Sequence, residues 1–159
     1  MGTRRQSREM AMQALFCMDM SCAFTMEMLA DFCRCFPPGK RAYQFFERLT
    51  HGVLQYREGI DRVVEQYSSN WKMRRMACVD RNILRLAVFE LLYCADIPAK
   101  VSINEAIDIA KKYGSMESGA FINGILDSIR MAMENKKLSP VALPPTTEMK
   151  EEILKEAES

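Results

Sequence analysis

Apolar residues recur through the middle of the chain in alternating steps of three and four positions. This spacing places them on one face of an α-helix and predicts a long amphipathic helix from about Ala42 to Ser68. Such a stripe usually packs into a core, and we favour that reading over a partner-binding groove. Gly52 and Gly59 interrupt the helix, and they mark a bend or a close helix contact. The stripe consists of Phe46, Leu49, Val53, Tyr56, Ile60, Val63 and Tyr67.

Other segments also have helical spacing, and none alternates apolar and polar positions for long enough to predict a strand. The first helix is expected from about Arg4 to Met18. A short helix should follow from Thr25, a candidate N-cap, to Phe36. The segment VDRNILRLAVFELLYC is the most apolar, and it predicts a helix that Pro98 stops.

Two more helices are expected after that proline. Ser102 and Glu105 in the sequence SINE predict a capping box, in which each side chain bonds the other residue's amide. Gly114 should end this helix, and Phe121 opens the next apolar stripe in FINGILDSI. The predicted fold class is therefore all-α, a compact bundle of six to seven helices.

The chain has 159 residues, enough for one domain with a core of its own. We assign residues 1–138 to the helical domain and residues 139–159 to a Pro-rich, acidic tail that should be poorly ordered. No apolar run reaches the ~20 residues that span a bilayer, and the N-terminus has no apolar signal core. We expect a cytoplasmic protein without membrane contact, with its six cysteines reduced.

Residues that carry catalytic chemistry are scarce, which argues against an enzyme. His51 is the only histidine, and we interpret it as a surface or boundary residue. No Gly-rich phosphate loop, HExxH or GxSxG motif occurs. The spacing within the cysteine-rich segment is unlike that of common zinc sites, so we expect buried or half-buried thiols, no metal and no cofactor. Its cysteines are Cys17, Cys22, Cys33 and Cys35.

Several charged residues lie inside the most apolar predicted helix. An unpaired buried charge costs several kcal/mol, so Arg85 and Glu90 are expected to find partners within the fold. Asp80 stands where that helix begins, a place in which the helix dipole favours an acid.

Two clusters could bind nucleic acid. Arg4, Arg5 and Arg8 fall within one sector of the first helix, and guanidinium groups match phosphate oxygens well, although a terminal charge run is more often simply solvated. The second cluster combines two cations with aromatic rings at a helix junction, as single-stranded RNA requires, although from the residues alone we favour both rings as core. It consists of Lys111, Lys112, Tyr113 and Phe121.

Motifs spread over residues 4 to 130 resemble one family. These are RRQSREMAMQAL, the Trp71 basic turn, the VDRNILRLAVFELL helix, IPAKVSINEAIDIAKKYG and FINGILD. In this order they are similar to the NusB family of bacterial transcription antitermination factors. The chain departs from the pattern in the Cys- and Met-rich segment 17–35, at Gln6 and Ser7, and in the tail.

The resemblance implies an RNA-binding protein that recognises the boxA element of nascent ribosomal RNA transcripts together with the ribosomal protein NusE. It places both basic clusters on the RNA surface. It assigns Phe16, Asp80 and Glu117 to the partner-binding surface, the two acids as exposed groups facing a basic protein. NusA, NusG and RNA polymerase would join through the antitermination complex. Some family members self-associate over the partner surface, so the resemblance leaves monomer and homodimer open.

Two rival interpretations remain at this stage. The same helical domain forms the N-terminal part of ribosomal RNA cytosine methyltransferases, so the chain could be a fragment of such an enzyme. A helical adaptor without RNA contact is the other alternative.

Overall fold

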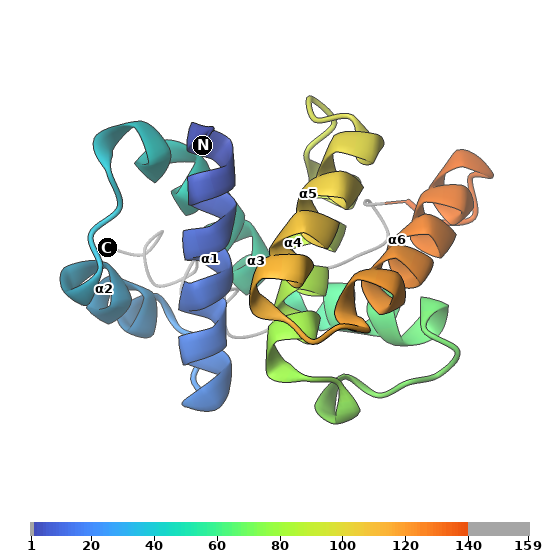
Figure 1. Ribbon diagram of the computed structural model, residues 1–159, viewed down its shortest axis with the longest axis horizontal. Coiled ribbons are helices and arrows are strands. Elements are labelled where there is room, and N and C mark those ends of the chain that lie inside the picture. The colour runs from blue at the N-terminus through green and yellow to red at the C-terminus, as the bar shows by residue number, and fades with distance from the viewer. Residues whose placement is uncertain (1, 140–159) are drawn as a thin grey trace, which may run out of the picture.

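The computed structural model describes residues 2–139, and in this range every regular element is a helix (Figure 1). The predicted all-α fold class is therefore confirmed. Six α-helices and one short 3-10 helix follow each other through short connections. They are α1 (Thr3–Met20), α2 (Met26–Cys35), α3 (Lys40–Tyr67), η1 (Met73–Arg75), α4 (Cys78–Tyr93), α5 (Ala99–Tyr113) and α6 (Ser118–Glu134).

Helix α4 lies at the centre of the fold, where it contacts α1, α3, α5 and α6 (Figure 1). Every residue from 82 to 92 is buried, which agrees with the apolar sequence of this helix. Because α4 has no solvent face over this stretch, its polar side chains must bond within the protein.

The long helix α3 matches its predicted extent, and Gly52 marks a close contact between helices. A Cβ atom at this position would lie 2.1 Å from Cζ of Phe89 on α4, so only glycine leaves room for the ring. The Phe89 ring stacks on Tyr93 at 5.6 Å, and Tyr93 stacks on Tyr56 of α3 at 4.1 Å. The missing side chain thus lets an aromatic stack join α3 to α4.

The boundaries around Pro98 differ from the prediction. Helix α4 ends at Tyr93, five residues before Pro98, and Pro98 is the N-cap of α5. Its carbonyl accepts from the Ser102 amide, so Ser102 already lies inside the helix and the predicted capping box is wrong. The fixed φ of proline starts α5 one turn earlier than the serine would. The Ser102 hydroxyl instead donates to Glu90 Oε1 at 3.0 Å.

At α2 the predicted cap is confirmed, because Thr25 Oγ1 accepts from the Met28 amide at 3.1 Å. The expected burial of the nearby thiols is wrong for most of them. Cys33 is half-buried, but Cys17 on α1, Cys22 in the turn after α1 and Cys35 at the end of α2 are exposed. Apart from Ser139, the tail lies outside the described residues. Within residues 2–139, no helix has the length and apolar character needed to cross a membrane.

Candidate functional site

The predicted RNA-binding residues gather mainly along the line where α1 runs beside α5, here called the α1–α5 seam (Arg4, Arg5, Glu9 and Gln13 with Glu105, Asp108, Lys111, Lys112 and Tyr113). Contacts step along both helices in the same direction, from Arg5 with Glu105 to Glu9 with Lys112. The two helices therefore run parallel, and they bring residues about one hundred positions apart into one surface.

Arg5 begins the seam, and it is held by two carboxylates of α5. Its Nε and Nη2 donate to Glu105 at 2.8 and 3.0 Å, and Nη2 also donates to Asp108 Oδ2 at 2.7 Å. These bonds and charges raise the pKa of Arg5 above its ordinary value. The side chain stays about one-third exposed (36%), so one edge of the guanidinium group can reach a ligand.

Lys112 lies further along the seam beside an aromatic ring. Its Nζ donates to both carboxylate oxygens of Glu9 at 3.1 Å, which raises the pKa of the lysine. The same ammonium group lies 5.2 Å from the centre of the half-buried Tyr113 ring. The Tyr113 hydroxyl accepts a long bond of 3.5 Å from Gln13 Nε2. A cation and a partly open ring thus occur together, as single-stranded RNA requires.

Arg8 is the exception among the predicted arginines, because its expected exposure is wrong. It is 4% exposed, and its Nε and Nη2 bind the carboxylate of Glu90 at 2.7 to 3.1 Å. Ser102 donates to the same carboxylate, and the Phe45 ring covers the guanidinium group at 5.1 Å. Arg8 therefore neutralises a buried acid of α4, which also confirms the expected internal partner of Glu90.

Arg85 has the internal partners that its position in α4 demands. It donates to Asp61 of α3 at 2.8 and 3.0 Å and to Asp19 of α1 at 2.8 Å. Arg81 also binds Asp19, at 2.5 and 2.8 Å. Burial alone would raise the pKa of Asp19, but the bond from Arg81 and the charge of Arg85 outweigh it and hold that pKa below its ordinary value.

Arg4 and Lys111 are exposed at the two ends of the seam. The Arg4 guanidinium group stacks on the Phe45 ring at 4.8 Å, and within residues 2–139 neither side chain forms an ion pair. The seam therefore carries four cations against three carboxylates, a weakly positive surface.

Phe121 lies apart from the seam, on the first turns of α6, where it is half-buried. Its ring meets the edge of Trp71 at a centroid distance of 6.0 Å and an angle of 66°. Trp71 is 52% exposed. The sequence interpretation used Trp71 only as part of a motif, and it missed this open aromatic pair. A tryptophan beside three cations (Lys72, Arg74, Arg75) was the signal available in the sequence.

Phe16, predicted to bind a protein partner, lines an open apolar groove between α1, α2 and α4, here called the Phe16 groove. Its volume is about 370 Å³. Phe36 at its edge is 60% exposed, an unusual position for so large an apolar side chain. The groove is lined by Met12, Gln13, Phe16, Cys17, Phe32, Phe36, Val79 and Tyr113.

The two acids predicted for the partner surface differ in environment. Glu117 is exposed at the start of α6, as expected. Asp80 is only 8% exposed, so its expected exposure is wrong; it lies in the first turn of α4 against the rest of the fold. Among the described residues its Oδ1 has no hydrogen-bond partner. A buried oxygen without a partner costs free energy, and this atom has almost no surface that an incoming donor could reach.

Comparison with known proteins gives one consistent family. Residues 5–131 match the model of the NusB family. The transcription antitermination protein NusB of Desulfatibacillum aliphaticivorans is 54% identical over 131 residues, which cover 82% of this chain and 92% of that protein.

Solved structures agree. T. maritima NusB has a TM-score of 0.73 and 36% identity, over 85% of this chain and 97% of that one. A chain in the crystal structure of antitermination factors NusB and NusE in complex with dsRNA has a TM-score of 0.73 and 27% identity, over 82% of this chain and 97% of that one. Sequence, fold and the pattern of motifs therefore lead to one conclusion: this chain belongs to the NusB family.

Proposed function

We propose that this protein is a transcription antitermination factor that binds boxA-type single-stranded RNA together with the ribosomal protein NusE. The observation that carries the proposal is the α1–α5 seam, where cations and a half-open tyrosine form one surface in a chain of the NusB family. A related chain forms a complex with NusE and dsRNA, which supports both partners.

On this surface, backbone and base contacts come from different residues. Arg4, Arg5, Lys111 and Lys112 contact phosphate groups, which set affinity but carry no sequence information. Tyr113 and Phe121 offer their rings to unstacked bases. Arg8 acts indirectly, because its pairing with Glu90 fixes the first turns of α1 beside α4 and α5.

NusE docks at the Phe16 groove. The groove offers exposed apolar surface around Phe16 and Phe36, and Glu117 supplies an exposed acid for a basic protein. Asp80 follows Val79, which lines the groove, and its mostly buried carboxyl group adds acidic character next to this surface. Stable interfaces usually have an apolar centre that loses its water on binding and a polar rim around it.

The assembled pair joins NusA, NusG and RNA polymerase in the cytoplasm, and the protein performs no catalysis itself. The D. aliphaticivorans relative is an antitermination protein, and this chain covers 92% of its length. This favours the antitermination reading over a fragment of a ribosomal RNA methyltransferase. A homodimer over the Phe16 groove would compete with NusE, and sedimentation with and without NusE distinguishes the two states.

Fluorescence anisotropy with boxA RNA and a scrambled RNA tests the proposal. The protein alone should bind weakly, because four seam cations face three carboxylates, and NusE should tighten binding to boxA substantially. Equal affinity with and without NusE would contradict a composite surface. The double variant R4A/R5A should weaken binding to both RNAs alike, since it removes only phosphate contacts.

Phe121→Ala separates stacking from packing. Loss of a stacked base costs about 1–3 kcal/mol of binding and narrows the gap between boxA and scrambled RNA. If the ring serves the core, truncation costs about 3–5 kcal/mol of stability instead, with RNA binding intact in the folded fraction. Thermal melting measured beside anisotropy decides between them.

Glu117→Lys should weaken NusE association and leave the melting temperature nearly unchanged. Asp80→Asn is the matched test at the buried acid, because it keeps the shape and removes the charge. NusE binding by both variants at the wild-type affinity would remove these acids from the interface.

A further inference from the structure

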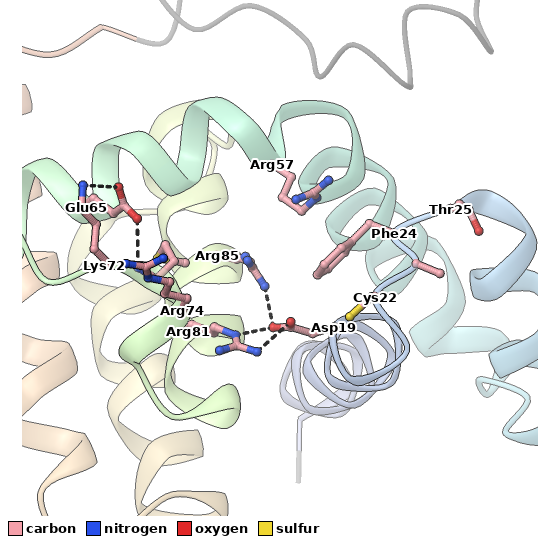
Figure 2. Close-up of a pocket in the computed structure, with 12 residues that line it drawn as sticks. Asp19, Cys22, Phe24, Thr25, Arg57, Glu65, Lys72, Arg74, Arg81 and Arg85 are labelled. Atoms are coloured by element: carbon pink, nitrogen blue, oxygen red, sulfur yellow. Dashed lines mark hydrogen bonds and ion pairs between the residues drawn. The ribbon is translucent and has the colours of Figure 1, made fainter.

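A large basic cavity lies at the opposite end of α1 from the arginine cluster, with a volume of about 950 Å³. Its walls come from the last turn of α1, the following loop, α3, the turn at Lys72 and Arg74, and α4 (Figure 2). Five cations and two carboxylates line it. The charged lining residues are Arg57, Lys72, Arg74, Arg81, Arg85, Asp19 and Glu65.

The inner wall of this cavity is a fixed network of charged side chains. Figure 2 shows Arg81 and Arg85 converging on Asp19, where a single carboxylate accepts from both guanidinium groups. Asp61 holds the other side of Arg85. Arg81 donates three hydrogen bonds, two to Asp19 and one to the Met76 carbonyl, from a guanidinium group with five N–H donors. Asp19 and Asp61 balance the charges of Arg81 and Arg85, so this network is close to neutral and its arginines are held in place by their acids.

The outer wall carries cations that are open to a ligand. Arg74 is exposed, and its side chain makes no ion pair or hydrogen bond within residues 2–139. Lys72 is 58% exposed and only loosely paired, with its Nζ at 3.7 Å from Glu65 Oε2. Long exposed side chains of this kind can move to a phosphate group at little cost.

The same turn connects the cavity to the aromatic pair described above. Trp71 directly precedes Lys72, it is 52% exposed, and its ring contacts Phe121 at 6.0 Å. An open ring next to exposed cations is the arrangement by which proteins follow a single strand, with bases stacked and phosphates neutralised.

We infer that the RNA strand continues past Phe121 over Trp71 and places its phosphodiester groups at the mouth of the basic cavity. Lys72 and Arg74 contact the phosphates and Trp71 stacks on a base, in front of the fixed network that Arg81 and Arg85 form with their acids. This inference rests on the proposed function, since it extends the same RNA path. It adds a second contact region that the seam alone does not provide.

Three RNAs test the inference: a short boxA RNA sized to the seam and Phe121, and two longer RNAs that extend it at one end or at the other. The variant K72Q/R74Q removes both mouth cations. The matched control K136Q/K137Q removes two exposed lysines after α6, which lie outside the cavity lining. All measurements use the full chain with NusE present, by anisotropy over a range of salt concentrations.

One lengthened RNA should bind wild type more tightly than the short RNA. K72Q/R74Q should reduce that affinity by about five- to tenfold at low salt, and lower the salt slope by about 0.7 for each lost phosphate contact. The same variant should bind the short RNA like wild type, and K136Q/K137Q should bind all three RNAs like wild type. Equal effects of the two double variants would overturn the inference, because only total charge would then matter.

Trp71→Ala should also weaken the lengthened RNA selectively, whereas Trp71→Phe, which keeps an aromatic ring, should retain most of the binding. Circular dichroism melting confirms that both variants fold. If lengthening the RNA at either end adds no affinity, the inference fails. It also fails if an acidic peptide binds more tightly than RNA and abolishes the extra affinity of the lengthened RNA without displacing the short RNA, because the cavity then takes a protein segment. If wild type binds none of these RNAs, the proposed function itself fails.

Discussion

The arginines at the start of α1 and the cations of the turn at Lys72–Arg75 look alike in sequence, but they differ in what holds them. Arg8 is sealed against Glu90, and Arg5 is shared between two carboxylates of α5. Arg74 and Arg75 are exposed, and within residues 2–139 their side chains form no ion pair. The comparison teaches that a run of cationic residues in the sequence does not show which side chains are free to bind a ligand. That depends on the acids that distant helices bring beside them.

The largest expected effect on stability lies at the start of α1, in the buried pair of Arg8 and Glu90. Glu90→Gln leaves the Arg8 guanidinium group buried without its counter-charge, and it should lower the free energy of unfolding by about 3–5 kcal/mol. Urea denaturation measures this. The double variant R8L/E90L should recover much of the loss, because both charges then disappear together. A loss of stability below about 1 kcal/mol for Glu90→Gln would mean that the ion pair is exposed to solvent instead of buried.

Asp19→Asn should come next, with a loss of about 2–3 kcal/mol, because it removes the carboxylate that accepts from Arg81 and Arg85. The folded-state pKa of Asp19 is lowered, so its ionised form stabilises the fold above its unfolded pKa of about 3.9. That contribution is lost as pH falls through the folded value. The gap in stability between wild type and Asp19→Asn should therefore narrow below about pH 4, and an unchanged gap would contradict the lowered pKa.

Arg5→Gln should have a smaller effect, at most about 1 kcal/mol, because the Arg5 side chain is partly exposed and its ion pairs are screened. Thermal melting at low and high salt measures it, and the difference from wild type should shrink as salt rises. A loss as large as that of Glu90→Gln would show that both arginines serve the fold equally.

The smallest effect on stability is expected in the turn that contains Arg74 and Arg75. R74Q/R75Q should unfold within about 0.5 kcal/mol of wild type in urea, since neither side chain has a partner within the described residues. A clear loss of stability would remove the contrast between the two regions and make the turn a structural element.

Local signals were sufficient to predict the helices. The period of the α3 stripe gave its extent, and Thr25 caps α2 as its chemistry predicts. The glycine at position 52 indicated a bend or a close contact, and the contact is what occurs. The stripe and the cap depend on residues within one or two helical turns, which is the range over which sequence spacing carries geometric information, whereas the partner of Gly52 lies on another helix and was not predicted.

Pairing between distant residues could not be predicted in the same way. That Glu90 needed a partner followed from the apolar helix around it, but the choice of Arg8 depends on how α1 packs against α4. Ser102 was assigned to a cap because its motif fits one, whereas Pro98 starts the helix earlier and frees the hydroxyl for Glu90. The basic cavity is assembled from four separate segments, so no single stretch of sequence reveals it.

The contact between Gly52 and Phe89 has a consequence for how this sequence can change over generations. Any larger residue at position 52 collides with the ring, and a smaller residue at position 89 empties space beside Tyr93 and loses the stack. Each single step is therefore deleterious, while the two steps together restore the fit. Positions 52 and 89 should drift as a linked pair among descendants of this chain, and a lineage that retains the aromatic ring at 89 retains glycine at 52.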